Sequence, residues 1–245
     1  MEATHKPVYK FENSCSRIDD ILNADDNSYS EADSIPSRND LTFTNGFYVY
    51  CTALFVDIRD SSDMTDKHRR PVLAKIYRCF ISEMVALMND FAKSKEVSIH
   101  GDCVWCVCDT PFKSDINNVF SLAARICSLV DIINFKLQKK GYQTFRVGVG
   151  IDYGRALMIK AGHSGSEIND VIWMGDVVNR ASHLCNEAGS NYTDKRIFMS
   201  NIFFDNLSEA NQKLCSKDLG RDIFQANVVN VAMNNWLEAQ GTVNR

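Results

Sequence analysis

The chain has 245 residues, of which 45% are hydrophobic and 24% are charged, a composition typical of a globular protein with one sizeable core. Its formal net charge of -4 excludes the strongly basic field that nucleic-acid and membrane-surface binding proteins carry. Nine irregularly spaced cysteines, together with an N-terminus that lacks an apolar core region, predict reduced thiols, no signal peptide and a cytoplasmic location.

Residues 1–45 are predicted to form an acidic accessory segment. They hold four Lys or Arg against nine Asp or Glu, so the segment carries a charge of -5 and the remainder about +1. Its centre, 23–34, is polar and rich in turn-forming residues, which predicts a loop. The main domain is therefore expected over 46–245.

The main domain opens with alternating strand and helix patterns. A run rich in β-branched and aromatic residues predicts a strand that ends near residue 58. Apolar residues spaced by three and four positions predict helices that end near 91 and over 115–139. Two strand-like runs, 95–100 and 103–109, flank Gly101 and Asp102, which predicts a hairpin, and 144–152 predicts the next strand.

This β-α-β-β-α-β order is the ferredoxin-like arrangement, so the fold class is predicted to be α+β. Further elements are expected after it: strands over 156–162 and 171–175, a helix over 176–187, a strand over 196–200, a helix near 200–214 and a terminal strand pair over 222–238. Gly148 and Gly150 lie inside a strand and lack a third glycine at the right offset, so they are not read as a dinucleotide-binding fingerprint.

Two carboxylates are expected to meet at one edge of this sheet. The apolar run in LFVDIRDSS leads directly into Asp57, and Asp102 lies at the tip of the hairpin beside that strand. Two neighbouring carboxylates repel unless a cation lies between them, and Mg²⁺ takes one or two carboxylates plus substrate phosphates. The pair therefore favours a phosphoryl-transfer site, whereas either Asp alone reads as a solvated turn residue.

Four motifs resemble those of the class III nucleotide cyclases, the adenylate and guanylate cyclase catalytic domain. LFVDIRDSS and HGDCVWCV resemble the two metal motifs, RVGVGIDYG the strand and turn after the second helix, and MGDVVNRAS the signature that opens the next helix. The motifs come in family order with family spacing and cover about 48–190. The chain is identified as a member of this family, with the catalytic domain over 46–245.

The resemblance implies a role for each matching residue. Asp57, Asp102 and the backbone carbonyl of Ile58 would hold two Mg²⁺ or Mn²⁺ ions, Arg146 would bind phosphate, and Asn179 would orient the ribose. The 3′-hydroxyl of a nucleoside triphosphate would attack its own α-phosphorus and expel pyrophosphate. The family works as a head-to-tail dimer, so a homodimer with two shared sites is expected, without a nucleic-acid or membrane partner.

Three positions depart from the family pattern. Ser98 stands where adenylate cyclases place a base-reading Lys and guanylate cyclases a Glu, and Ile172 stands where adenylate cyclases place Asp or Thr. Loss of both polar purine readers predicts a different substrate. His183 stands in place of the transition-state Arg, so either His183 takes over that role, or Arg180 or Arg155 does.

A cyclase without purine determinants resembles the bacterial pyrimidine cyclases of the antiphage system called Pycsar. That resemblance implies cyclic UMP or cyclic CMP as the product, with UTP favoured over CTP, and a separate cyclic-nucleotide-binding effector that responds to it. Tyr50, seven residues before Asp57, could stack on a small base or simply pack beside the sheet. Ser98 could hydrogen-bond a pyrimidine edge.

Several readings stay open. Lys160, Lys217 and Arg221 are candidates for the family's late phosphate-binding Lys, and no motif decides between them. His100 reads as a turn residue and Trp173 as strand core. The rival functions are an adenylate cyclase with atypical base contacts and a catalytically silent nucleotide-binding dimerisation module.

Overall fold

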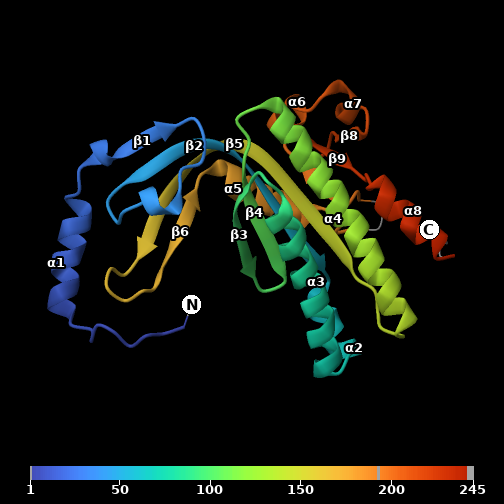
Figure 1. Ribbon diagram of the computed structural model, residues 1–245, viewed down its shortest axis with the longest axis horizontal. Helices are drawn as coiled ribbons and strands as arrows, with labels where there is room; N and C mark the ends of the chain where they lie inside the picture. The colour runs from blue at the N-terminus through green and yellow to red at the C-terminus, as the bar shows by residue number, and fades with distance from the viewer. Residues whose placement is uncertain (1, 192–193, 242–245) are drawn as a thin grey trace. The chain divides into compact units, whose positions relative to one another are not determined.

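The computed structural model describes residues 2–191 and 194–241, apart from the side chains of 65–67 (Figure 1). The chain divides into two compact units. The first holds the residues up to Tyr50 together with Arg155–Asp176, and the second holds Cys51–Gly154 together with the residues from Val177 onward.

The second unit contains the predicted βαββαβ core. Its elements are β2 (Gly46–Arg59, here from Cys51), α2 (Ser61–Lys67), α3 (Arg70–Asp90), β3 (Ser94–His100), β4 (Cys103–Asp109), α4 (Lys113–Lys139) and β5 (Arg146–Gly162, here up to Gly154). The strands neighbour one another in the order β3-β4-β2-β5, and β4 is antiparallel to both β2 and β3. The predicted ferredoxin-like α+β fold is therefore confirmed.

The C-terminal elements extend this sheet. They are α5 (Asp176–Glu187), β7 (Ile197–Met199), α6 (Asn201–Asp205), α7 (Glu209–Gln212), β8 (Cys215–Asp218), β9 (Ile223–Ala226) and α8 (Val231–Ala239). β7 pairs parallel with β5, and β9 and β8 follow antiparallel.

Two predictions for this region are wrong. The helix expected near 200–214 is two short helices, because Ser200 and Ser208 each cap a new start. Of the strand pair expected over 222–238, β9 lies in that range, but its partner β8 precedes it, and the second half of the range is α8. The side chain of Asn230 accepts a hydrogen bond from the backbone of Met233 at 3.1 Å, so it starts a helix in a segment whose Val residues favour strand.

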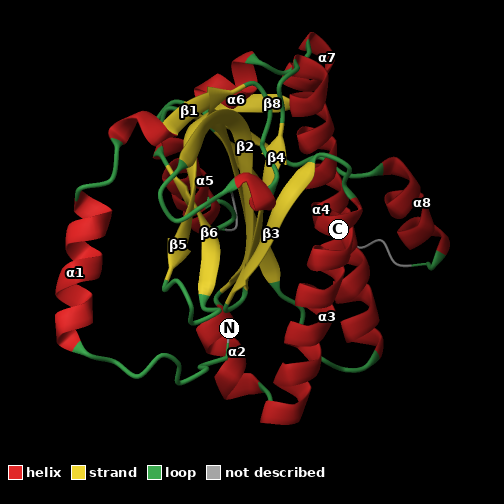
Figure 2. Cartoon of the chain, turned by 60° about the vertical axis from the view of Figure 1, so that its left-hand side comes forward, coloured by secondary structure: helices red, strands yellow, loops and turns green. Residues whose placement is uncertain are grey.

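One face of the second unit's sheet carries the main hydrophobic core. Alternate residues of β5, Val147, Val149 and Ile151, are fully buried in the cluster that α3 and α4 also form. Both helices lie side by side along this face (Figure 2). The apolar periodicity of α3 predicted this, since Ile76 and Phe80 on its inner side are fully buried.

The opposite face of β5 receives α5 in direct backbone contact. A Cβ on Gly150 would lie 2.1 Å from the carbonyl oxygen of Ala181 and 2.1 Å from the amide nitrogen of Cys185. A Cβ on Gly148 would lie 2.4 Å from the carbonyl oxygen of Ala188. Because neither glycine has a side chain, α5 lies flat on the strand, and the Cys185 thiol donates to the carbonyl of Gly148 at 3.2 Å.

The first unit is formed by the N-terminal segment and the outer part of the β5–β6 hairpin. It contains α1 (Phe11–Leu22), two 3₁₀ turns (Asp26–Ser28 and Arg38–Asp40), β1 (Tyr29–Ala32), the start of β2, the end of β5, and β6 (Asn169–Met174). β1 pairs parallel with β2, so the loop predicted over 23–34 is wrong for four of its residues. Glu31 of β1 pairs with Arg155, whose guanidinium lies 3.8 Å from the Tyr48 ring centroid.

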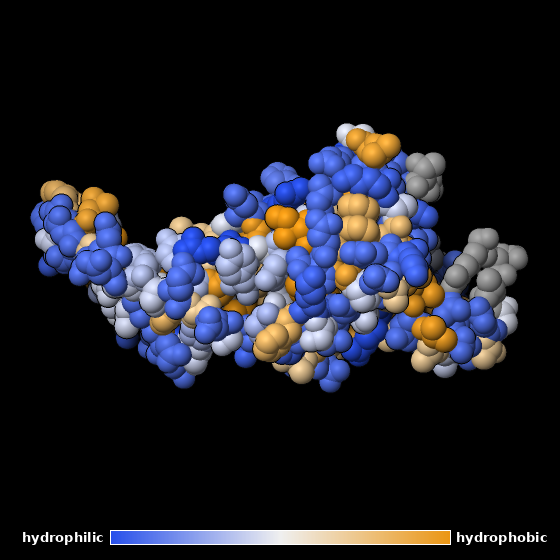
Figure 3. All heavy atoms as spheres, turned by 90° about the horizontal axis from the view of Figure 1, so that it is seen from above, coloured by the Kyte–Doolittle hydropathy of each residue, from blue (hydrophilic) through white to orange (hydrophobic). Residues whose placement is uncertain are grey.

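Two helices differ in how they bury their apolar residues. α1 has no buried residue, and Phe11, Ile18, Ile21 and Leu22 are all more than half exposed. Figure 3 shows hydrophobic side chains at the surface where α1 lies, at the left of the view. Among the described residues, α4 is long and apolar enough to cross a membrane by length and composition alone. However, 56% of its most apolar stretch is buried, as in the core helix of a soluble protein.

We predict that Gly150→Ala destabilises the protein by about 3 kcal/mol, because its Cβ would overlap the backbone of α5. Gly220→Ala is the matched control, since a Cβ there would meet only a carboxylate oxygen of Asp218 at an ordinary 3.5 Å. Urea unfolding of both variants checks this. Equal midpoints for the two variants would contradict the direct seating of α5 on β5.

Candidate active site

The structure brings Asp57 and Asp102 together, as the strand order predicts. Asp57 lies opposite Cys103 in the β2–β4 ladder, and Asp102 precedes Cys103 in the β3–β4 turn. Gly101 makes that turn with a φ of +64°, a backbone conformation that glycine adopts without strain. The two carboxylates thus lie at one end of two adjacent strands.

The surroundings of Asp57 oppose its negative charge. Burial and, second, the charge of Asp102 raise the pKa of Asp57, and the neighbouring Arg59 offsets this only in part. Burial, with Asp57 and Asp102, also raises the pKa of the Cys103 thiol to about 12. The local field is therefore negative and would favour a cation.

The donor set fits a hard divalent cation. Asp57, Asp102 and the backbone carbonyl of Ile58 are oxygen donors, and no group of three or more His, Cys, Asp or Glu forms a metal cluster within 2–191 and 194–241. Two carboxylates suit Mg²⁺ or Mn²⁺, which keep waters and substrate phosphates as their other ligands, better than they suit a closed zinc site.

A cavity of about 370 Å³ lies beside Asp57, between the sheet and α5. Its strand wall consists of Phe55, Asp57, His100, Cys103 and Trp105, and its helix wall consists of Val178, Asn179, Ser182, Cys185 and Asn186. Asp57 and Asn179, predicted from separate motifs, therefore line the same cavity.

An aromatic row forms the strand wall of this cavity. The rings of Phe55 and Trp105 are stacked with centroids 4.9 Å apart and planes 3° from parallel. The indole nitrogen of Trp105 donates to Nδ1 of His100 at 3.0 Å, and His100 is the last residue of β3 rather than a turn residue. Trp105 is also the ladder partner of Ser98, so the base-reading position of the family lies beside this row.

Sequence reasoning missed Trp105 as a cavity residue. Residues two apart on a strand share a face, and Trp105 follows Cys103 by two positions, so the alternation of β4 was the available signal.

His183 and Arg180 do not line the cavity. Both are exposed on α5, whereas Asn179 and Ser182 of the same helix face Asp57. Lys217 chiefly, and Arg180 to a smaller degree, lower the pKa of Asp222, which indicates that Arg180 lies toward the β8–β9 hairpin. Neither side chain therefore reaches the Asp57 cavity of its own chain.

Arg146 connects two loops. From the first position of β5, its guanidinium donates to the Asp60 carboxylate at 2.7 Å and to the carbonyl of Gly189 at 2.9 Å. Asp60 follows β2 and Gly189 follows α5, so Arg146 joins the loop after Asp57 to the end of the helix that carries Asn179.

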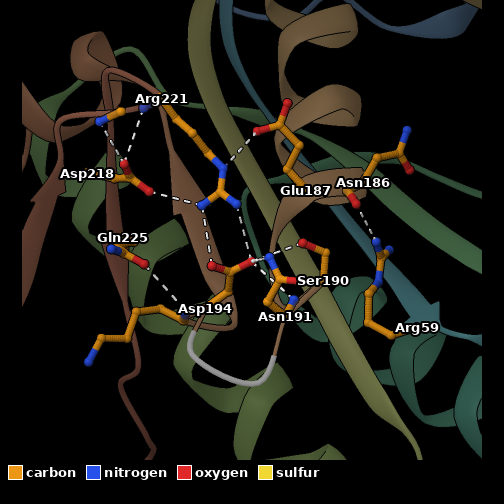
Figure 4. Close-up of polar contacts among 11 residues, drawn as sticks. Arg59, Asn186, Glu187, Ser190, Asn191, Asp194, Asp218, Arg221 and Gln225 are labelled. Atoms are coloured by element: carbon orange, nitrogen blue, oxygen red, sulfur yellow. Dashed lines mark hydrogen bonds and ion pairs between the residues drawn. The ribbon is translucent and has the colours of Figure 1, made fainter.

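The late cations are engaged by carboxylates. Arg221 contacts Asp218 at 3.0 Å, Asp194 at 3.3 Å and Glu187 at 3.7 Å (Figure 4). Lys217 pairs with Asp222 at 2.6 Å. Arg221 therefore fastens the last residue of α5 rather than projecting a charge into the cavity.

The remaining predicted positions belong to the first unit. Tyr50 and Ile172 are exposed, at 55% and 42%, and Ile172 is the ladder partner of Ile159. Trp173 is buried, which confirms its reading as strand core. Lys160 lies 5.1 Å from the ring centroid of Phe43.

Comparison with known sequences shows the family. The model of the adenylate and guanylate cyclase catalytic domain matches residues 46–220. The uridylate cyclase of Gulbenkiania mobilis is 39% identical, over 97% of this chain and 99% of its own. The uridylate cyclase of Treponema porcinum is 30% identical, over 94% of this chain and 81% of its own.

Solved structures show the same fold. A class III adenylyl cyclase-like ATP-binding protein from Pseudomonas aeruginosa has a TM-score of 0.66 at 17% identity, covering 92% of this chain and 48% of that chain. The adenylyl cyclase CyaB from P. aeruginosa has a TM-score of 0.60 at 17% identity, covering 72% and 87%. The chain belongs to the adenylate and guanylate cyclase catalytic domain family, the class III nucleotide cyclases.

We predict that Arg221→Gln lowers the melting temperature at pH 7 by about 2–4 °C, and by less at pH 3. Partial burial of Asp194 opposes its ionisation, but hydrogen bonds from Ser190, Asn191 and Arg221 outweigh this and lower its pKa. A carboxyl whose pKa falls on folding stabilises the fold above its unfolded pKa, and that stabilisation is lost as the pH falls through the folded value.

Thermal melts of wild type and variant between pH 3 and pH 7 check this. Arg125→Gln is the control, because Arg125 makes one 3.6 Å contact with the exposed Asp90. A melting-temperature difference that stays constant with pH would show that Arg221 acts through packing alone.

Proposed function

We propose that this chain is a pyrimidine nucleotide cyclase that converts UTP, or CTP, to the 3′,5′-cyclic monophosphate and pyrophosphate. The observation that carries the proposal is the cavity in which Asp57, next to Asp102, faces Asn179 across a gap between sheet and helix. The names of the Gulbenkiania mobilis and Treponema porcinum relatives support uridine as the base.

Each residue has a role in this chemistry. Asp57, Asp102 and the carbonyl of Ile58 would hold two Mg²⁺ or Mn²⁺ ions, which when bound neutralise charge on the triphosphate. The Asn179 amide orients the ribose, so that O3′ bonds to the α-phosphorus as the bond between that phosphorus and the oxygen bridging to the β-phosphate breaks. Pyrophosphate leaves with the bonding electrons, and the hydroxyl proton passes to solvent water. Arg146 binds phosphate by exchanging its contact with Asp60.

Base selection rests both on the purine-binding polar groups that this site lacks and on the groups that can contact a pyrimidine. Ser98 and Ile172 replace the polar residues that read purines in the family, so a purine loses its hydrogen-bond partners. Ser98, the ladder partner of Trp105, can donate to or accept from a pyrimidine edge. Tyr50 would add a ring that narrows the site around a small base.

A homodimer with two shared sites explains the exposed face of α5. His183 occupies the position of the family's transition-state Arg yet does not line the cavity of its own chain. We propose that His183, or its neighbour Arg180, serves the site of a second copy. Asn179 is also exposed and lies on the same helix.

The proposed setting follows from the resemblance to the pyrimidine cyclases of antiphage defence. The enzyme would act in the cytoplasm through its catalytic domain over 46–245, and the cyclic nucleotide would activate a separate effector that binds it. The acidic segment 1–45 would be accessory to this domain.

Two other functions have support. An adenylate cyclase with atypical base contacts agrees with the fold of CyaB. A silent nucleotide-binding module agrees with the coverage of the ATP-binding protein from Pseudomonas aeruginosa, which extends over 92% of this chain.

The first experiment is a product assay. The purified protein is incubated with ATP, GTP, CTP and UTP together in the presence of Mn²⁺, and the products are identified by mass spectrometry. We expect cyclic UMP, and we expect Asp57→Ala to lower its formation at least about a hundredfold, because it removes a carboxylate that holds the charge-neutralising cation.

Asp90→Ala is the matched control, since Asp90 is 76% exposed and ends α3 just before β3 begins, whereas Asp102 follows the other end of β3. Cyclic CMP would keep the pyrimidine class and change the base. Cyclic AMP would contradict our reading of Ser98 and Ile172. Nucleotide binding without any product would favour the silent module.

Tyr50 is tested by its effect on base preference. We expect Tyr50→Ala to lower the ratio of kcat/KM for UTP over ATP by about tenfold, because the ring no longer narrows the base site. Tyr50→Phe keeps the ring and should keep the ratio. Identical ratios in wild type and Tyr50→Ala would show that the ring packs beside the sheet without meeting the base.

A further inference from the structure

Arg59 is a buried cation beside the proposed metal site. It ends β2 two residues after Asp57, so both side chains lie on the same face of the strand. Its side chain is only 9% exposed, whereas Asp57 is 22% exposed. A guanidinium this deeply buried requires acceptors close by.

The two terminal nitrogens of Arg59 reach different elements. Nη2 donates to Oδ2 of Asp57 at 2.9 Å, and Nη1 donates to the carbonyl oxygen of Asn186 at 2.7 Å (Figure 4 shows the second contact). Asn186 lies in the last turn of α5, where helix carbonyls carry partial negative charge. Arg59 therefore links a metal-binding carboxylate to the helix that carries Asn179.

The third guanidinium nitrogen of Arg59, Nε, has no acceptor. Its Nε is buried and lacks a hydrogen-bond partner among the residues that the structure describes. Buried arginine donors are normally satisfied, so this side chain is one acceptor short in its present position. In this position Arg59 neutralises Asp57, but it would gain a hydrogen bond in a position where Nε meets an acceptor.

The charges at this site set a competition. Asp57, Asp102 and Arg59 together leave one net negative charge, and without Arg59 they would leave two. A metal ion on Asp57 and a guanidinium hydrogen-bonded to the same carboxylate repel each other across a short distance. Holding the carboxylate in one orientation would favour metal binding, but this ordering effect is smaller than repulsion between adjacent full charges.

We propose that Arg59 is the resident counter-cation of the metal site, and that it competes with the metal for Asp57 until nucleotide phosphates add negative charge. This inference rests on the proposed function, because it takes Asp57 as a metal ligand. Metal binding would weaken the contact of Arg59 with Asp57 and leave Arg59 on the C-terminal carbonyl of α5. Arg59 is thus a positioning residue that makes metal loading depend on nucleotide.

The test measures Mn²⁺ affinity by electron paramagnetic resonance, with and without uridine 5′-(α,β-methylene)triphosphate, which cannot cyclise. Without nucleotide we expect Arg59→Gln and Arg59→Met to bind Mn²⁺ about tenfold more tightly than wild type. The nucleotide analogue should improve Mn²⁺ affinity of wild type by a larger factor than that of these neutral variants. Arg59→Lys keeps the charge and should stay within about threefold of wild type.

Arg221→Gln is the matched control. Arg221 also fastens the end of α5, through Glu187 (Figure 4). Its other ion pairs within the described residues are with Asp194 and Asp218, not with Asp57. Its Mn²⁺ affinity should stay within about twofold of wild type. Circular dichroism verifies folding, and two neutral variants are used because one of them could fail to fold.

Each outcome decides the matter. Tighter Mn²⁺ binding in the neutral variants supports the competition. Weaker Mn²⁺ binding would mean that Arg59 orients Asp57 for the metal. Unchanged Mn²⁺ binding would mean that Arg59 only fastens α5. Either result overturns the inference and leaves the cyclase proposal intact. If wild type binds no Mn²⁺ even with the analogue, the metal site of the proposed function fails and this inference fails with it.

Discussion

The close contact between α5 and the glycines of β5 determines where the site forms. Without side chains at Gly148 and Gly150, the helix backbone lies against the strand, and Asn179 comes over the end of β2 where Asp57 lies. A larger residue at either glycine would lift the helix and open the cavity between them. Packing at two glycines, which have no side-chain chemistry of their own, thus sets the distance between Asp57 and Asn179.

Three arginines connect α5, and the loop after it, to the neighbouring elements. Arg59 joins the last turn of α5 to Asp57 of β2, and Arg221 joins Glu187 of the same turn to Asp194 and Asp218. Arg146 joins the loop after β2 to the loop after α5. β2 and α5 are therefore connected by charged side chains, an arrangement that suits the metal and triphosphate binding that we propose for this site.

Local pattern predicted most of the fold but few of the long-range contacts. The spacing of apolar residues predicted α3 and α4, and together with the strand-like runs it predicted the βαββαβ order, because both depend on near neighbours in sequence. β1 was missed since its four residues, YSEA, show no apolar alternation and form a strand by pairing with β2. α8 was missed because a single cap at Asn230 outweighed the strand propensity of Val228, Val229 and Val231 around its start.

The candidate site shows the same limit. Strand order was enough to place Asp57 near Asp102, but the contact of Arg59 with Asn186 joins residues 127 positions apart, and no local pattern indicates it. The assembled site is tested most directly by mixing Asp57→Ala protein with a variant that carries both Arg180→Ala and His183→Ala, and measuring cyclic UMP formation from UTP. If each site combines Asp57 of one copy with His183 or Arg180 of another, the mixture should recover about a quarter of wild-type activity. An active wild type whose mixed variants stay silent would contradict the shared site.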